Sequence, residues 1–406
     1  MSVTVLRGAG ADVREDGVPR HAEIGTLELE SGFRLPEVRI AYETWGVLAP
    51  DGSNAVLVEH ALTGDTHVAA GRARPGAPEA RRRAAESGGW WDGLVGPGAA
   101  IDTDRYFVVC ANIVGGCYGS TGPSTPAPAE VDPERRPWGS RFPLVTVRDS
   151  VRAEAALADA LGIDTWRLVI GGSMGGARAL EWAVTYPERV RACAVVAACP
   201  QSSAEQLAWG QAQNLAIRQD PDFRGGDYYD GPFPVTGLGL ARRIAHITYR
   251  SADELHHRFG RTPQAEEQVI GTHPGGRGRY QVESYLDHQA SKLAGRFDAN
   301  SYLAVNETLM SHDVCRGRGT LEEALSVTSC EWLVAAVDSD RLYLPRESDV
   351  LAAALPGDVR RHTLTSPSGH DGFLIEAPQV GKLLVETVLA RPCARAGGAA
   401  GGTLVP

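Results

Sequence analysis

Short apolar runs recur along the chain, and each one stops at a turn rich in glycine or polar residues. The runs lie at 55–60, 105–111, 167–170, 195–198 and 332–337. Runs this short, rich in Val, Ile and Ala, are typical of strands that are buried on both faces of a parallel sheet. Apolar and polar residues alternate in places over 24–45, which predicts a pair of antiparallel strands ahead of them.

Helical segments separate several of these runs. A helix is predicted from about Gly176 to Tyr186, shortly after the run at 167–170. Strands that alternate with helices predict an α/β fold, in which a mostly parallel central sheet is flanked by helices on both faces.

The pattern changes over 201–324, where charged residues and helix formers dominate and no strong strand signal occurs. We interpret this block as a helical lid inserted into the sheet domain, because the strand pattern returns at residue 332. The predicted core is therefore discontinuous and comprises residues 1–200 and 325–393. The segment 394–406, ARAGGAAGGTLVP, carries too little apolar surface to offset the entropy of ordering, so we predict a flexible tail.

Composition narrows the functional classes. Apolar residues make up 43% of the chain, and the formal net charge is −10. This charge argues against nucleic acid and anionic membranes as partners, since both attract clustered Lys and Arg. No apolar run is long enough to predict a membrane span, and the opening MSVTVLRGAGADVRED does not resemble a signal peptide. The seven cysteines include no CxxC pair, which indicates free thiols and a cytoplasmic protein.

A candidate nucleophile follows the run at 167–170. Gly171-Gly172-Ser173-Met174-Gly175 fits G-x-S-x-G, between a predicted strand and a predicted helix. This is the context of the nucleophile elbow of α/β hydrolases, where a tight turn exposes the serine oxygen. The helix N-terminus that follows favours developing negative charge, and the backbone N–H of Met174 is a candidate oxyanion donor.

A serine hydroxyl needs a base to take its proton, and the base needs a group to orient it. On this fold the partners follow the nucleophile in the order Ser, Asp, His. Asp340 comes just after the run at 332–337, and His370 lies on a loop before a C-terminal helix. Asp338 is the alternative acid, disfavoured because it lies too close to the strand.

The segment after the run at 55–60 is the other half of the predicted oxyanion hole. Leu62 is the candidate for the second backbone donor, and Thr63 is a candidate substrate-binding residue. The alternative is that this loop only packs beneath the lid. Asp65 and His67 are the one pair here that suggests a metal, but two ligands at i and i+2 are too few, so no metal site is predicted.

Several longer motifs resemble one family. The homoserine O-acetyltransferases of the α/β-hydrolase superfamily, with their close serine acetyl- and succinyltransferase relatives, are similar over roughly 27–389. The matching text includes HALTGDTHV at 60–68, GWWDGLVGPG at 89–98, ANIVGGCYGSTGPS at 111–124, WGSRFPLVTVRD at 138–149, GGSMGGARALEWA at 171–183, GGDYY at 225–229, RFDANSYL at 296–303 and SGHDGFLIE at 368–376.

The resemblance implies an α/β-hydrolase fold and ping-pong chemistry. An acyl-CoA, usually acetyl-CoA, would acylate the serine, and an acceptor hydroxyl would then take the acyl group, with no bound cofactor. The family pattern implies that Asp371 holds the acceptor's amino group and that Tyr228 and Tyr229 line the lid side of the site. It also implies a cytoplasmic homodimer joined through the lid.

Two departures from the family pattern fall in the lid. Counted back from Asp220-Pro221, the family's carboxylate-binding arginine corresponds to Asn214, which cannot make a bidentate charged contact. Arg218 lies one helical turn further on. The text after RFDANSYL, from Ala304 to Met310, departs as well. These changes predict an acceptor other than plain homoserine, either a related amino alcohol or a specialised metabolite. The predicted function is therefore acyl transfer to the hydroxyl of homoserine or a related amino alcohol, with the hydroxyl of a specialised metabolite as an alternative.

Two other functions compete with acyl transfer. A serine esterase would use the same three residues, but a large lid favours exclusion of water and so favours transfer. A binding protein on a retained fold would be expected to have lost Ser173, Asp340 or His370, and all three are present.

Overall fold

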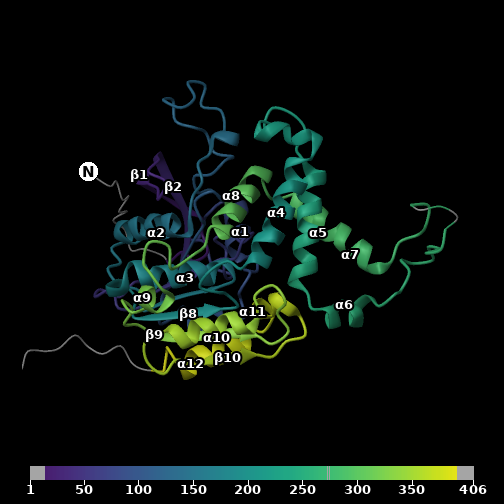
Figure 1. Ribbon diagram of the computed structural model, residues 1–406. Helices are drawn as coiled ribbons and strands as arrows, with labels where there is room; N and C mark the ends of the chain where they lie inside the picture. Colours follow the sequence, from purple (N-terminus) through teal and green to yellow (C-terminus); the bar gives the residue numbers. More distant parts are fainter. Residues whose placement is uncertain (1–13, 272, 274, 391–406) are drawn as a thin grey trace, which may run out of the picture.

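A computed structural model describes residues 14–271, 273 and 275–390 of the chain. Its centre is an eight-stranded sheet in the order β1-β2-β6-β3-β7-β8-β9-β10 (Figure 1). The strands in that order are β1 (Arg20–Glu28), β2 (Arg34–Trp45), β6 (Phe107–Ala111), β3 (Ala55–Glu59), β7 (Leu168–Gly172), β8 (Ala192–Val196), β9 (Glu331–Val337) and β10 (Arg361–Leu364). The pairs β1–β2 and β2–β6 are antiparallel, and the other neighbours are parallel.

The central strands are buried on both faces, which explains why their sequences are almost entirely apolar. In β7, Val169 packs into one core cluster, whereas Leu168 and Ile170 pack into the other. The same alternation occurs in β3, where Leu57 faces the first cluster and Val56 faces the second. Each strand therefore joins two cores, as expected for a sheet covered on both sides.

Helices cover both faces of the sheet. The first core cluster contains residues of α2 (Val147–Leu161), α3 (Met174–Thr185), α9 (Leu321–Leu325) and α10 (Pro345–Ala354). The second contains residues of α11 (Gly372–Ile375), α12 (Ala377–Glu386) and the small strands β4 (Val95–Gly96) and β5 (Ile101–Asp102). The remaining core helix is α1 (Glu79–Glu86), and 3-10 turns occur at η1 (Gly139–Arg141), η2 (Pro187–Arg189) and η4 (Gly369–Asp371).

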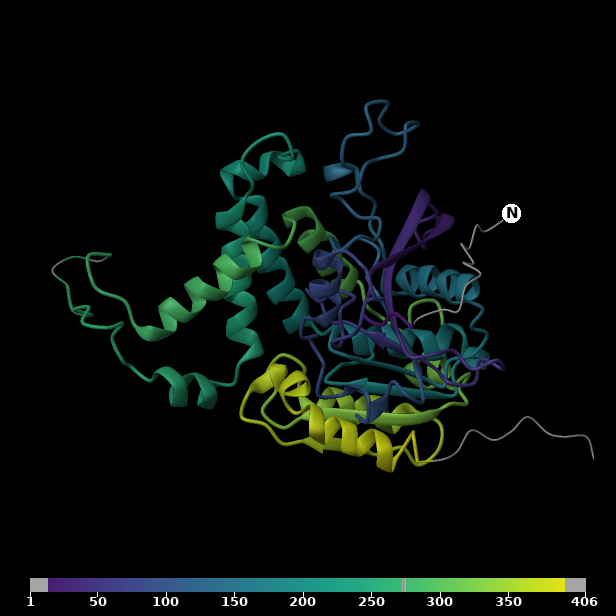
Figure 2. The ribbon, with the colours of Figure 1, turned by 180° about the vertical axis from the view of Figure 1, so that it is seen from behind.

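Between β8 and β9 the chain leaves the sheet and forms a separate helical layer (Figures 1 and 2). Its elements are α4 (Ala204–Arg218), η3 (Pro221–Gly226), α5 (Val235–Tyr249), α6 (Ala252–Phe259), α7 (Gln281–Ala294) and α8 (Ala299–Met310). A third apolar cluster joins this layer to the core, because it includes Leu62 and Met174 beside lid residues such as Tyr302 and Leu238. The lid therefore packs directly over the candidate nucleophile elbow and oxyanion loop.

The predicted fold class is confirmed: the sheet is mostly parallel and is flanked by helices. The antiparallel pair predicted within 24–45 starts earlier, at Arg20, and the strand predicted at 195–198 lies at Ala192–Val196. Ala197, directly after that strand, has φ 47°, so extended pairing stops there. The predicted tail at 394–406 lies outside the described residues. Within the described part of the chain, no helix has the length and apolarity needed to cross a bilayer.

Candidate active site

Ser173 occupies the turn between β7 and α3 in a strained conformation, with φ 59° and ψ −126°. Its backbone N–H donates to the carbonyl of Val196 at 3.0 Å. A Cβ on Gly171 would lie 2.2 Å from the carbonyl carbon of Gly175. A Cβ on Gly175 would lie 2.1 Å from the backbone carbonyl oxygen of Glu59. The glycines are therefore required for the close backbone approach that holds the serine in this turn.

A buried charge cluster lies beneath the elbow. The Arg178 guanidinium on α3 pairs with Glu59 at the end of β3 and with Glu154 on α2. It also donates to the carbonyl of His60 at 3.4 Å. Burial raises the pKa of Glu59 well above its ordinary value, despite the nearby guanidinium. This cluster ties the helix that carries Ser173 to the segment that carries Leu62.

Asp340 and His370 are in direct contact. The Nδ1 of His370 lies 2.6 Å from Oδ2 of Asp340, and Oδ1 of Asp340 accepts the backbone N–H groups of Leu342 and Tyr343. Burial disfavours the imidazolium, but the Asp340 carboxylate outweighs that effect and raises the pKa of His370. The alternative acid, Asp338, instead accepts the backbone N–H of Ser366 at 3.1 Å.

The other edge of the His370 ring is open. Its Nε2 is buried and has no hydrogen-bond partner among the described residues. The ring stacks on Tyr343 at 4.9 Å and lies 6.0 Å from Tyr249, and both tyrosines line the same cavity as Ser173. The described contacts include no hydrogen bond between Ser173 and His370, which is common before a substrate is bound.

Leu62 also lines the Ser173 cavity, and Met174 is the buried first residue of α3. The Leu62 segment is held by His60, whose Nδ1 contacts the Ala61 carbonyl at 2.7 Å while Nε2 accepts the Ile113 N–H at 3.1 Å. Because Nε2 must keep its lone pair for that bond, the ring is neutral. Burial, assisted by Arg178, lowers the pKa of His60 to about 3.

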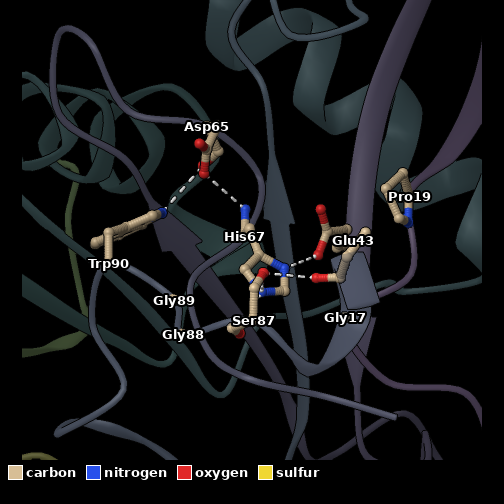
Figure 3. Close-up of a pocket in the computed structure, with 10 residues that line it drawn as sticks. Gly17, Pro19, Glu43, Asp65, His67, Ser87, Gly88, Gly89 and Trp90 are labelled. Carbon is tan, nitrogen blue, oxygen red and sulfur yellow. Dashed lines mark hydrogen bonds and ion pairs between the residues drawn. The ribbon is translucent and has the colours of Figure 1, made fainter. Parts of the chain in front are cut away.

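His67 stands at the other end of the same segment in the opposite protonation state. Figure 3 shows it between Glu43 and Ser87: Nδ1 lies 2.7 Å from the Glu43 carboxylate, and Nε2 lies 2.9 Å from the Ser87 carbonyl. Both partners are acceptors, so both ring nitrogens carry protons. The hydrogen bond to Glu43, against partial desolvation, raises the pKa of His67 to about 9.

This arrangement bears on the Asp65–His67 pair considered for a metal. With both ring nitrogens protonated, His67 has no lone pair to offer a cation. One Asp65 oxygen accepts the backbone N–H of His67 at 3.0 Å. Among the described residues, no three His, Cys, Asp or Glu side chains are grouped so that they could ligate a metal ion.

The lid residues proposed from the sequence lie around the cavity rather than in its wall. Asn214 donates from Nδ2 to Glu307 at 2.8 Å and accepts from Asn306 at 2.8 Å, so it faces α8. The hydroxyls of Tyr228 and Tyr229 donate to Asp298 at 2.6 and 3.2 Å. None of these three predicted substrate-binding residues is among those that line the Ser173 cavity.

Asp371 and Thr63 are not among the residues that line the Ser173 cavity either, and both contact arginines that form a charged side of the site beside it. Asp371 is paired with Arg250 at 3.0 Å, and burial raises the pKa of its carboxyl despite that partner. Thr63 accepts a hydrogen bond from Arg242 at 3.4 Å. The Arg242 guanidinium also lies 5.7 Å from the ring centroid of Tyr249, and it has no ion-pair partner among the described side chains.

Arg242 was missed in the sequence interpretation. A signal for it exists, because Arg242 and Tyr249 are seven residues apart and therefore share one face of a helix. The sequence alone does not say which face of α5 turns toward Ser173.

Comparison with known proteins agrees with this geometry. Residues 54–377 match the model of the alpha/beta hydrolase fold family. A homoserine O-acetyltransferase of Thermobifida fusca is 56% identical, with 89% of this chain and 90% of the relative aligned. One of Clavibacter michiganensis is 50% identical over 89% of this chain and 90% of its own length. The chain belongs to the homoserine O-acetyltransferase family.

The solved structures that this chain resembles include both transferases and hydrolases. The homoserine O-acetyltransferase of Bacillus anthracis superposes with a TM-score of 0.80 at 27% identity, covering 91% of this chain and 97% of that one. An acetylester hydrolase of Corynebacterium glutamicum superposes with a TM-score of 0.74 at 25% identity, covering 92% and 96%. The fold therefore does not by itself separate acyl transfer from ester hydrolysis.

The two departures expected from the homoserine O-acetyltransferase pattern meet in space. Asn214 on α4 contacts Asn306 and Glu307 on α8, and Arg218 pairs with Glu307 at 3.2 Å. Arg218 therefore points along the outside of the lid and does not replace a carboxylate-binding residue at Ser173. Within these two departures, Asn306, Leu309 and Met310 line the cavity, whereas Asn214 does not.

Proposed function

We propose that this protein transfers an acetyl group from acetyl-CoA to the hydroxyl of homoserine through an acyl-enzyme on Ser173. The observation that carries the proposal is the buried Asp340–His370 pair, whose Nε2 has no hydrogen-bond partner among the described residues. The His370 ring contacts Tyr343, which lines the same cavity as the strained Ser173. Relatives named homoserine O-acetyltransferase, at 56% and 50% identity, support the acceptor and the acyl group.

In the first half-reaction, the Ser173 oxygen attacks the thioester carbonyl while His370 Nε2 takes its proton. Asp340 holds the Nδ1–H and stabilises the imidazolium that forms. The backbone N–H groups of Leu62 and Met174 stabilise the oxyanion. The carbon–sulfur bond then breaks, and the departing CoA sulfur takes the proton from His370.

In the second half-reaction, the acceptor hydroxyl gives its proton to His370 and attacks the acetyl ester on Ser173. The tetrahedral intermediate collapses, and the serine oxygen recovers a proton from the imidazolium. One thioester bond is broken and one oxygen ester is formed, so neither water nor an oxidant is consumed.

Two groups of opposite charge support an amino acid as the acceptor. We assign the acceptor carboxylate to Arg242, which has no carboxylate partner among the described residues and donates to Thr63. We assign the acceptor's ammonium group to Asp371, which follows His370 in the chain and would share its carboxylate between this group and Arg250. Arg242 offers the positive charge that Asn214 lacks. These contacts therefore favour homoserine itself as the acceptor over a related amino alcohol or a specialised metabolite.

The test is a coupled assay with acetyl-CoA in the presence and absence of hydroxyl acceptors. We expect CoA release to require homoserine and the product to carry one added acetyl group, with other amino alcohols and larger hydroxyl compounds less efficient. Thiol release at the same rate without acceptor would instead identify an ester or thioester hydrolase, the function of the similar acetylester hydrolase.

We also propose that two copies associate through the lid. Large apolar side chains are exposed on α4 and α5, namely Leu207, Leu215, Val235, Leu240 and Ile247. Exposed apolar groups that gather on neighbouring helices favour association. Sedimentation velocity should give twice the chain mass, and the double substitution Leu215→Glu with Leu240→Glu should give the monomer.

A further inference from the structure

The lid wall of the Ser173 cavity is polar but uncharged. Apart from the aromatic residues Trp209 and Tyr249, five of its lining residues have neutral hydrogen-bonding side chains: Ser202, Gln206, Gln213, Thr248 and Asn306. No charged side chain lines this cavity among the described residues. A buried polar group is usually paired, so an open group in such a wall indicates where a ligand binds.

Three of the five are already satisfied by the protein. The Ser202 hydroxyl donates to the Leu309 carbonyl at 2.7 Å, and Thr248 donates to Ala245 at 2.8 Å. Gln206 accepts the Ser203 N–H and donates to the Leu342 carbonyl. These side chains hold the wall together and offer little to a ligand.

Gln213 and Asn306 differ from them. The Oε1 of Gln213 accepts from Tyr302 at 2.6 Å, whereas no hydrogen bond among the described residues uses its Nε2. The Nδ2 of Asn306 donates to the Gly210 carbonyl at 3.0 Å and to Asn214, which leaves its Oδ1 open. Only 6% of Gln213 and 4% of Asn306 is exposed, so the open donor and the open acceptor are both deep in the wall.

The orientation of Asn306 is fixed by its partners. Gly210 offers a backbone carbonyl, which can only accept, so the nitrogen of Asn306 must point there and the oxygen must point away. Helices α4 and α8 approach closely at this point, since a Cβ on Gly210 would lie 2.7 Å from the sulfur of Met310. Asn214, which accepts from Asn306, is itself held by its hydrogen bond to Glu307.

One open donor and one open acceptor in the lining of the same cavity match a secondary amide, which presents a carbonyl and an N–H. We propose that Gln213 and Asn306 bind the amide nearest the thioester in the acyl donor, an assignment that rests on the acyl-transfer function proposed above. In a pantetheine-type thioester this amide is two methylene groups from the sulfur, so it lies close to Ser173 when the carbonyl does.

This assignment also separates the two substrates. A zwitterionic acceptor finds its charged partners, Arg242 and Asp371, outside this wall, whereas the neutral arm of the donor finds amide partners within it. Charged groups in a neutral buried wall would be left without a counterion, which is costly.

The test compares two small acetyl donors on the same enzyme preparation, with homoserine as acceptor. S-acetyl-N-acetylcysteamine carries the amide, and S-butyl thioacetate lacks it. We expect the wild-type enzyme to favour the amide donor in kcat/KM by roughly ten- to a hundredfold, because two buried hydrogen bonds are at stake. Gln213→Met and Asn306→Leu should each reduce this ratio several-fold.

The ratio separates recognition from folding, because a poorly folded variant loses rate with both donors alike. Ser202→Ala is the matched control: its hydroxyl is used by Leu309, so the ratio should stay at the wild-type value. A wild-type ratio near one, or full discrimination in both variants, would overturn the amide subsite while leaving acyl transfer intact. Absence of transfer from acetyl-CoA itself to any acceptor would overturn both proposals.

Discussion

The two walls of the Ser173 cavity are built in different ways. The core wall holds Ser173 at φ 59°, and Asp340 accepts three hydrogen bonds there, so these groups are fixed before a substrate arrives. The lid wall leaves the Nε2 of Gln213 and the Oδ1 of Asn306 without partners among the described residues. The first wall is fixed by contacts within the protein, whereas the second leaves two polar groups open, as the proposed amide subsite requires.

This difference has a physical origin. The elbow and the loop that carries Asp340 leave the ends of β7 and β9, which are packed between two core clusters, so small displacements are strongly resisted. The lid wall consists of side chains on α4 and α8, where a substitution changes a hydrogen-bonding group without moving a strand. Specificity in such a fold is therefore expected to vary in the lid while the chemistry is retained.

The largest effect should come from removing the nucleophile on the core wall. Ser173→Ala leaves no oxygen to accept the acetyl group, so we expect turnover to fall by at least about 10⁴-fold. Intact mass after incubation with acetyl-CoA alone should show one added acetyl group in the wild type and none in the variant. An acetylated variant would place the acyl-enzyme on another residue.

A slightly smaller loss is expected when the orienting acid is made neutral. Asp340→Asn retains the shape but no longer stabilises the His370 imidazolium, so kcat should fall roughly 10³–10⁴-fold. Asp338→Asn is the matched control, because Asp338 contacts the Ser366 backbone instead. Equal losses in the two variants would argue against Asp340 as the acid of the triad.

A moderate effect is expected on the charged side of the site. Arg242→Met removes a charge-assisted contact worth about 1.5–3 kcal/mol, so KM for homoserine should rise roughly ten- to a hundredfold with a smaller change in kcat. Arg243→Met serves for comparison, because Arg243 pairs with Asp287 at 2.7 Å within the lid. An unchanged KM for homoserine in the Arg242 variant would mean that another residue binds the acceptor carboxylate.

The smallest effect should appear in stability at alkaline pH. The pKa of His67 is raised to about 9, so its contribution is complete below about pH 6.5 and is lost as the pH rises through 9. Discounted for partial exposure, that contribution is about 1–2 kcal/mol.

Denaturant unfolding at pH 7 and pH 10 measures this contribution. His67→Gln should be less stable than the wild type at pH 7 and should lose most of that difference at pH 10. His60, whose pKa lies near 3, stays neutral throughout this range and adds no slope. A constant difference between the two proteins across the range would contradict a protonated His67 clamp.

The core wall was predictable from the sequence because its signals are local. In the sequence, Ser173 is flanked by glycines and lies directly between a predicted strand and a predicted helix. Asp340 and His370 each follow the end of a predicted strand. Nothing local indicates which face of a lid helix turns inward. Asn214 was therefore expected at the acceptor, although the structure turns it toward α8, and Arg242 and Gln213 were overlooked.

The order of β9 and β10 along the chain has a consequence for synthesis on the ribosome. Ser173 emerges early, whereas Asp340 and His370 emerge only after the whole inserted layer has been made. Under the proposed mechanism, a nascent chain that ends before β9 has a serine without its base, so we expect its hydroxyl to be inert toward thioesters. Turnover is then expected to begin when the final strands dock, so its first appearance during refolding would report completion of the sheet edge.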